Sequence, residues 1–376
     1  MSTKFPSILS SAGALRRVAV VACLTAIAVP NFAMANPMIV VDVKSGRVIE
    51  HQEAFRKWYP ASLTKLMTAY TAFKAIRAGE LSLQSIVTMS THAAAEPASK
   101  TYFKPGSRLT LDSAFKLLIV KSANDIAVAI AETVSGSEER FVARMNADAK
   151  ALGMTSSRFV NPNGLPGKGQ YTTARDLALL AAAIRRDFPE YASYFSLEGV
   201  TTGKKNYAAY NLLVGRFDGA DGMKTGYICA SGFNQVSSAT RNGRTVISVV
   251  LGADSLGARA DQSADLLQKG LTTATAGGGR LESLQPYGEG LDQVVDISSE
   301  ICNPKARQVR SEGRDEVGRM KLLSPYIHEM DHQPSFSYAG LISGGEPADK
   351  AKGEAKGGAQ VSEIANVPIP RPRPTF

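Results

Sequence analysis

The stretch GFNQVSSATRNGRTVISVVLG, residues 232–252, predicts two antiparallel β-strands joined by a tight turn. Asn-Gly, at residues 242–243, is a strong hairpin signal, because both central positions of such a turn need positive φ. The β-branched residues on either side favour extended structure. A second hairpin is predicted near the start of the chain, where MIVVDV (38–43) and RVIE (47–50) flank a Lys-Ser-Gly turn.

Helical patterns fill the chain between the two hairpins. Apolar residues recur with helical spacing in six segments, the last of them beyond the second hairpin: 63–77, 111–120, 125–134, 138–152, 174–186 and 258–271. Strands at both ends of a domain, with helices between them, imply one antiparallel sheet that closes only when distant parts of the chain meet. The predicted fold class is therefore mixed α/β (α+β).

The first 35 residues indicate export. Three basic residues precede an apolar run at 18–29, which is followed by Ala33-Met34-Ala35, the arrangement of a cleavable secretory signal. The run is shorter than the roughly 20 apolar residues that span a bilayer. We therefore expect a mature chain that starts at Asn36 and has no membrane span. It would work in the periplasm or at the outer face of the cytoplasmic membrane.

The net charge of +9 suits peripheral contact with an anionic membrane or cell wall. Aromatic and basic residues do not interleave in the way that is typical of nucleic-acid binding, so no nucleic-acid partner is expected.

The amino-acid composition and the apolar periodicity of the chain change after Ala276. Three glycines at 277–279 mark a break, and the remaining sequence is polar, poorly periodic and rich in proline and arginine near its end. This composition predicts a largely disordered region over 276–376. An exported compartment would permit a disulfide between Cys229 and Cys302, but the sequence leaves their pairing open.

The motif Ser62-Leu63-Thr64-Lys65 begins one of the predicted helices, so its serine and lysine share one face. A serine hydroxyl is a poor nucleophile until a neighbouring base removes its proton. Lysine can be that base only if its pKa falls well below about 10.4, through burial or a second nearby cation. Alone, the motif is common by chance.

Two further motifs occur later in the chain. Ser122-Ala123-Asn124 lies between two predicted helices, where its hydroxyl could relay a proton and its amide could hold Lys65 or a substrate. Taken alone it is equally a helix cap. Lys224-Thr225-Gly226 precedes the first strand of the second hairpin. It offers a cation and a hydroxyl to a carboxylate, and a glycine beside which a substrate backbone can lie.

Together, the three motifs predict a serine acyl-transfer site in which lysine handles the proton. The backbone N–H groups of Ser62 and Tyr227 would form its oxyanion hole. An extended peptide could add to the edge of the sheet at the third motif.

Beyond the motifs, several segments resemble the serine D-alanyl-D-alanine carboxypeptidases, the low-molecular-mass penicillin-binding proteins of the β-lactamase/transpeptidase-like superfamily. The similarity runs from about Asn36 to Thr275 and includes PASLTKLMT (60–68), FVNPNGL (159–165), GQYTTARD (169–176), and LGA (251–253) followed by Arg259.

The resemblance implies a catalytic domain over 36–275, with a five-stranded antiparallel sheet flanked by helices and a helical subdomain. It implies no cofactor. The implied substrate is the D-Ala-D-Ala end of a peptidoglycan stem peptide, and β-lactams would acylate the same serine.

The resemblance also implies roles for individual residues. The catalytic ones are the nucleophile Ser62, its base Lys65 and the proton relay Ser122. The substrate-binding ones are Asn124, Lys224, Thr225, Gly226, Tyr227 and Arg259, of which Lys224, Thr225 and Arg259 would hold the terminal carboxylate.

Two departures from the family stand out. Tyr227 occupies a position where some relatives have histidine. The stretch after Ala276 shows neither the alternation of their β-rich second domain nor their amphipathic membrane anchor.

Other functions remain open from the sequence. The same acyl-enzyme could serve a D,D-endopeptidase, a transpeptidase or a β-lactamase, although residues 156–167 lack the acid that fast β-lactamases use, so slow deacylation is expected. His328-Glu329-Met330-Asp331-His332 matches a zinc-peptidase motif, but Pro334 limits any helix there. A non-catalytic wall-binding protein is the remaining alternative.

Overall fold

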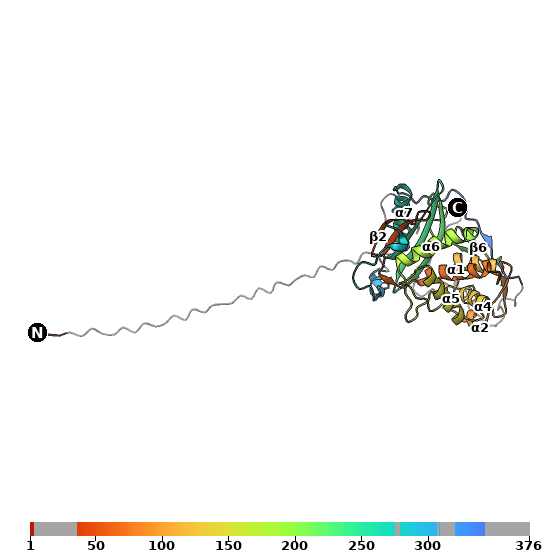
Figure 1. Ribbon diagram of the computed structural model, residues 1–376, viewed down its shortest axis with the longest axis horizontal. Coiled ribbons are helices and arrows are strands. Elements are labelled where there is room, and N and C mark those ends of the chain that lie inside the picture. The colour runs from red at the N-terminus through yellow and green to blue at the C-terminus, as the bar shows by residue number, and fades with distance from the viewer. Residues whose placement is uncertain (4–35, 275–278, 307, 309–319, 343–376) are drawn as a thin grey trace, which may run out of the picture. The chain divides into compact units, whose positions relative to one another are not determined.

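The structure, a computed structural model, describes residues 1–3, 36–274, 279–306, 308 and 320–342 (Figure 1). Apart from residues 1–3, the predicted signal peptide lies outside the described residues, as does the Pro/Arg-rich end of the chain.

A five-stranded antiparallel sheet forms the centre of the fold, as predicted. Its strands lie in the order β2-β1-β10-β9-β8, which brings the two predicted hairpins together through β1 and β10. Val40 pairs with Ser248, and Thr245 with Thr240. The strands are β1 (Met38–Asp42), β2 (Val48–Gln52), β8 (Ala220–Ile228), β9 (Gly232–Arg241) and β10 (Arg244–Ala253).

The third motif lies within a strand rather than before one. Lys224, Thr225 and Gly226 belong to β8, which pairs with β9 and forms one edge of the sheet. The sequence does not predict this strand, because its apolar residues do not alternate and two glycines interrupt it.

The helices lie close to their predicted ranges. In α1 (Thr64–Arg77), apolar and polar side chains alike are buried, since other helices surround it. The subdomain around it is built from α2 (Thr91–Ala95), α3 (Leu111–Lys116), the π-helical turn η2 (Leu117–Lys121), α4 (Asn124–Ser135) and α5 (Glu138–Ala151).

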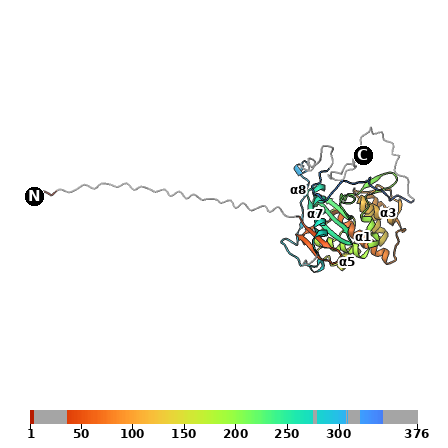
Figure 2. The same cartoon turned by 90° about the horizontal axis from the view of Figure 1, so that it is seen from above.

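Two more helices cover the sheet. Helix α6 (Ala174–Asp187) packs on β1 and β10, and α7 (Leu256–Thr272) packs on β9 and β10 (Figure 2). In α7, Gly270 allows close approach, because a methyl group there would meet the side chains of Val246 and Val40.

Short elements complete the framework. They are β3 (Lys57–Trp58), β4 (Ile86–Thr88), β5 (Arg108–Thr110), β6 (Gly199–Thr201), β7 (Asn206–Ala208), and the 3₁₀ turns η1 (Ala61–Leu63), η3 (Pro189–Phe195) and η4 (Leu281–Ser283). Within the ranges that the structure covers, no helix has the length and apolar character that a membrane crossing requires.

Residues 279–306 and 320–342, which lie within the region expected to be largely disordered, form ordered contacts with the domain. Over its described part the region packs on the domain through β11 (Val294–Val295) beside β3, α8 (Ser298–Ile301), and β12 (Ser337–Tyr338) beside β6. A disulfide joins Cys229 to Cys302. Single buried side chains such as Ile297 and Ile301 anchor this part of the chain at irregular intervals. The sequence therefore has no periodic apolar pattern from which the packing could be predicted.

Candidate active site

Ser62 lies in the short turn η1, immediately before α1. The Oγ of Ser62 is 3.0 Å from the Nζ of Lys65, which lies one turn along the same face. The preceding residue, Ala61, adopts a φ of 47°, an uncommon conformation for a residue other than glycine. Backbone strain of this kind clusters at functional sites.

Lys65 is completely buried and lies among oxygen atoms. Its Nζ lies 2.7 Å from Oδ1 of Asn124 and 2.6 Å from the carbonyl oxygen of Asn163. Burial, and then the positive charge of Lys224, hold the pKa of Lys65 well below its usual range, although Asp125 and Glu96 oppose them. An amine with a low pKa beside a hydroxyl can accept that hydroxyl's proton.

Ser122 and Lys224 form a second hydroxyl–amine pair. Ser122 ends η2 in a left-handed conformation, with φ 59°, which places its side chain in the cleft. Lys224 Nζ donates to Ser122 Oγ at 3.0 Å and to the carbonyl of Thr225 at 2.9 Å. Burial, and then the nearby charge of Arg259, lower the pKa of Lys224 to about 7.

Arg259 projects from the first turn of α7 and is 2% exposed. Its Nη2 donates to the carbonyl of Tyr210 at 3.1 Å, while its buried Nε has no hydrogen-bond partner among the described residues. Burial lowers its pKa to about 9. Within the described residues, no carboxylate forms an ion pair with Arg259 or Lys224. Buried cations without counter-ions are expensive unless an anion joins them, so this end of the cleft is suited to a carboxylate.

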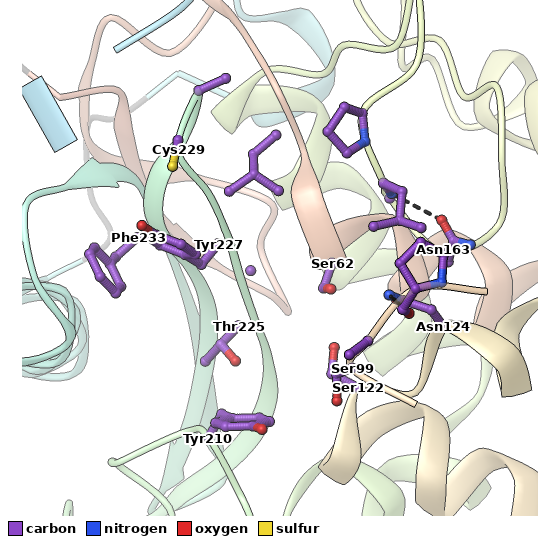
Figure 3. Close-up of a pocket in the computed structure, with 18 of the residues that line it drawn as sticks. Ser62, Ser99, Ser122, Asn124, Asn163, Tyr210, Thr225, Tyr227, Cys229 and Phe233 are labelled. Atoms are coloured by element: carbon purple, nitrogen blue, oxygen red, sulfur yellow. Dashed lines mark hydrogen bonds between the residues drawn. The ribbon is translucent and has the colours of Figure 1, made fainter. Parts of the chain in front are cut away.

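Ser62, Ser122, Asn124 and Arg259 border one cleft of about 470 Å³ (Figure 3). Ser62 lies near its middle, with Ser122, Thr225 and Tyr210 at one end and Cys229 at the other. The lining of the cleft also includes the apolar residues Leu165, Pro166, Ile228, Phe233 and Leu256.

Glycines bring the walls of the cleft together. A methyl group at Gly226 would lie 3.1 Å from the backbone nitrogens of Ser62 and Leu63. Strand β8 therefore runs directly beside η1, the turn that carries Ser62. We expected Gly226 to make room for a substrate backbone; it lines the cleft and also makes room for the turn that carries Ser62. A methyl group at Gly164, whose φ is 86°, would overlap the carbonyl oxygen of Ala61.

Tyr227 follows Gly226 in the cleft wall. Its ring packs on Phe233, with the ring centroids 4.3 Å apart, and its hydroxyl lies 3.3 Å from Sγ of Cys302. The side chain is thus in contact with the disulfide, and the backbone of Tyr227 continues the strand that borders Ser62.

Sequence analysis missed several residues around the site. The carbonyl of Asn163 contacts Lys65 through the backbone, which no side-chain pattern reveals. The Asn-Pro-Asn-Gly turn was visible, and its bonds include Gly164 N donating to Asn161 Oδ1 at 2.8 Å. Asp125, one residue after Asn124, is buried and accepts hydrogen bonds from the N–H and Oγ1 of Thr101 at 2.8 and 2.5 Å.

Residues 156–167 contain no acid, but Glu96 reaches this loop from another segment. It accepts a hydrogen bond from Nδ2 of Asn163 at 2.8 Å, and burial raises its pKa. The carboxylate is therefore tied to the side chain of Asn163, whose backbone carbonyl holds Lys65.

The His-Glu-x-x-His motif does not form the geometry of a zinc site. Its residues are not helical, and the two histidines contact different carboxylates: His328 is 3.0 Å from Asp218, and His332 is 2.6 Å from Glu198. Across the described ranges, no cluster of three metal-ligating side chains occurs.

Known proteins share this architecture. The family model described as D-alanyl-D-alanine carboxypeptidase (Peptidase_S11) matches residues 25–255. The carboxypeptidase DacC of Escherichia coli (strain K12) is 37% identical over 243 residues, which make up 63% of this chain and 61% of that relative. The chain thus matches about three fifths of the length of this curated relative.

Solved structures show the same fold. DacD from Francisella tularensis has a TM-score of 0.61 at 33% identity, covering 63% of this chain and 70% of that one. Penicillin-Binding Protein D2 from Listeria monocytogenes, in an ampicillin-bound form, has a TM-score of 0.56 at 30% identity, covering 64% and 98%. The family model matches more than half of the length of this chain, and the chain therefore belongs to the D-alanyl-D-alanine carboxypeptidase family.

Proposed function

We propose that this chain is a serine D-Ala-D-Ala carboxypeptidase, which removes the terminal D-alanine from peptidoglycan stem pentapeptides through an acyl-enzyme on Ser62. The observation that carries the proposal is the fully buried Lys65, 3.0 Å from Ser62 and with a depressed pKa. A lysine in this setting is an uncharged base aimed at a serine hydroxyl.

In the acylation step, Lys65 takes the proton of Ser62 while Oγ attacks the carbonyl of the penultimate residue. The N–H groups of Ser62 and Tyr227 stabilise the oxyanion. This role is supported by the position of β8, which runs beside η1, the turn that carries Ser62. Ser122, hydrogen-bonded to Lys224, delivers a proton to the leaving amine of D-alanine, and the proton that Lys65 took from Ser62 replaces it, so that both groups return to their starting states. Water then hydrolyses the ester and frees Ser62.

Substrate binding depends on charge. Arg259 and Thr225 hold the terminal carboxylate, with Lys224 supporting both. These roles are supported by the burial of Arg259 and Lys224, which form no ion pair in the part of the chain that the structure describes. Asn124 positions Lys65 through its Oδ1, since its Nδ2 donates to the carbonyl of Pro97 at 3.0 Å and so fixes the amide.

The same site would be acylated by β-lactams, which resemble the D-Ala-D-Ala end. The ampicillin-bound form of the Listeria relative supports this part of the proposal. Release of the penicilloyl group should be slow, because the loop at 156–167 presents no carboxylate and Glu96 is bonded to Asn163. Rapid hydrolysis of a chromogenic cephalosporin would contradict this expectation.

The substrate places the enzyme outside the cytoplasm. We propose export through the signal-like first 35 residues, with action in the periplasm or at the outer face of the cytoplasmic membrane. Detection of a chain beginning at Asn36 in a periplasmic extract tests this, and retention of the uncleaved chain in the cytoplasm would contradict it.

One experiment tests the enzymatic proposal. The purified chain is incubated with a stem pentapeptide, and released D-alanine is measured beside covalent labelling by a fluorescent penicillin. We expect Ser62→Ala to abolish both and Lys65→Ala to slow both by several orders of magnitude. D-alanine release that persists in Ser62→Ala, or that a metal chelator abolishes, would overturn the mechanism.

A further inference from the structure

A disulfide holds a distant part of the chain against one end of the cleft. Cys229 directly follows β8 and lines the cleft at the end away from Tyr210 (Figure 3). Its partner, Cys302, directly follows α8. We call residues 294–302, which include β11, α8 and Cys302, the cross-linked segment. Ser298 belongs to this segment and also lines the cleft.

Contacts next to the disulfide place Ser298 at the same end of the cleft. The N–H of Ile297 donates to the carbonyl of Ala230, the residue after Cys229, at 3.1 Å. A methyl group at Gly232 would lie 3.0 Å from Cδ1 of Ile297, so this side chain packs against the backbone at the start of β9. Ser298 comes next in the chain and therefore forms part of the cleft wall beside Cys229.

Helix α8 depends on distant partners for its position. It is one turn of four residues, which is too short to be stable alone. The preceding strand β11 pairs with β3 over two residues, and Ile297 and Ile301 supply buried apolar contacts. The disulfide adds a covalent link between positions 73 residues apart, which restricts the segment far more than contacts of this size do. Opening the disulfide should therefore let α8 move away from the cleft.

The cross-linked segment lies where the upstream residues of a stem peptide would lie. In the proposed function the terminal carboxylate binds at the Tyr210 end, so the residues before the scissile bond extend past Ser62 toward Cys229. Strand β8 passes the Ser62 turn at Gly226, and Cys229 lies three residues further, about 10 Å along an extended strand.

This distance separates short peptides from long ones. A tripeptide that ends in D-Ala-D-Ala has two residues before the scissile bond, which span about 7 Å when extended and stop short of the segment. A pentapeptide has four such residues, which span about 13 Å and reach it. The Ser298 hydroxyl can donate a hydrogen bond to a peptide carbonyl or accept one from a peptide N–H.

We propose that the Cys229–Cys302 disulfide positions Ser298 to bind the upstream residues of a stem peptide, and that it thereby sets a preference for longer peptides. This inference rests on the proposed function. Cys302 is a positioning residue, because it acts through α8. Both cysteines are half-buried, so a dithiol in solution reaches the cross-link.

Reduction by a dithiol opens the cross-link in two exchange steps. One thiolate of the dithiol attacks a sulfur of the disulfide, and the S–S bond between Cys229 and Cys302 breaks. The second thiol of the dithiol then displaces the protein sulfur and closes a cyclic disulfide. Two electrons and two protons pass to the protein, which leaves both cysteines as thiols.

The test compares a stem pentapeptide with a tripeptide that ends in D-Ala-D-Ala, using D-alanine release by the full chain. The wild type is measured before reduction by dithiothreitol, after it, and after reoxidation. Two variants are measured beside it: Cys302→Ser, which lacks the cross-link, and Ser298→Ala, which keeps it. The control is Ser335→Ala, which loses a 3.0 Å hydrogen bond to Glu198 in another part of the region after residue 276.

We expect reduction, or Cys302→Ser, to raise KM for the pentapeptide about fivefold, because a hydrogen bond and its neighbouring contacts are lost. Ser298→Ala should raise this KM about threefold. The kcat values, all tripeptide kinetics and the control variant should not change. Reoxidation should restore the wild type, and dithiothreitol should have no further effect on Cys302→Ser.

Three outcomes overturn the inference and leave the carboxypeptidase proposal intact: a pentapeptide KM that reduction does not change, an equal change with both peptides, or an effect of dithiothreitol on Cys302→Ser as large as on the wild type. If Cys302→Ser does not fold, reduction of the wild type and Ser298→Ala decide the question. Absence of D-alanine release from both peptides and of penicillin labelling in the oxidised wild type would overturn the proposed function itself.

Discussion

Replacing Gly164 by alanine tests whether the loop behind the nucleophile positions it. Gly164 has a φ of 86°, and an added methyl group would overlap the carbonyl oxygen of Ala61 and lie 2.9 Å from Oγ1 of Thr64. The backbone carbonyl cannot rotate away as a side chain would. The turn that carries Ser62 must therefore shift by on the order of 1 Å to restore an ordinary contact distance.

The expected cost has two parts. A left-handed alanine costs roughly 1–2 kcal/mol, and overpacking adds about 1–3 kcal/mol, so the free energy of unfolding should fall by roughly 2–5 kcal/mol. A displacement of about 1 Å at a reacting atom can slow catalysis about 100-fold. We expect acylation by penicillin to slow by that factor.

Gly153→Ala is the matched control. Gly153 also has a positive φ, 74°, but no atom of the described residues lies within 4 Å of an added methyl group. This variant should show only the backbone cost and should be acylated at the wild-type rate. Urea unfolding and time courses of labelling by a fluorescent penicillin measure both effects. Equal acylation rates in the two variants would refute the reasoning.

Three other perturbations have defined outcomes. Asn124→Ala removes the 2.7 Å contact to the amine of Lys65 and should slow penicillin acylation by about 10- to 100-fold; an unchanged rate would count against a positioning role. Because Lys224 has a pKa of about 7, it loses its charge as the pH rises through that value, so kcat/KM for a carboxylate-terminated peptide should fall above about pH 7. Lys224→Arg should move that fall to higher pH, and a profile identical to wild type would show that the charge does not matter. Cys302→Ser opens a cross-link that spans 73 residues and should lower the free energy of unfolding by about 4 kcal/mol on a chain-entropy model; urea denaturation that matches wild type without reductant would contradict this.

Local patterns carry much of the information about this fold. The hairpin with Asn-Gly at 242–243 was predictable, because turn chemistry and β-branching act within a few residues. The helices were predictable from their apolar spacing. Strand β8 was not, since it is held by pairing with β9 and by contact with the turn at Ser62, rather than by any alternation of its own.

The region after residue 276 illustrates the same limit. Its described part is attached by one disulfide, by pairs of residues in β11 and β12, and by single buried side chains. Each attachment depends on a partner that is distant in the sequence. The sequence of this region shows that its apolar residues are not periodic. It does not show which single residues pair with, or are buried against, distant parts of the chain.

By itself, the sequence determined which chemical groups this protein possesses: a serine and a lysine one helical turn apart, a second serine near an amide, and a third motif with a lysine and a threonine. Only the tertiary structure decided their chemistry. It buries Lys65 between Asn124 and the carbonyl of Asn163, and it buries Lys224 and Arg259 where no carboxylate of the described residues forms an ion pair with them. The reason is physical: a pKa depends on burial and on charges in space, and both are set by segments that the chain brings together only when it folds.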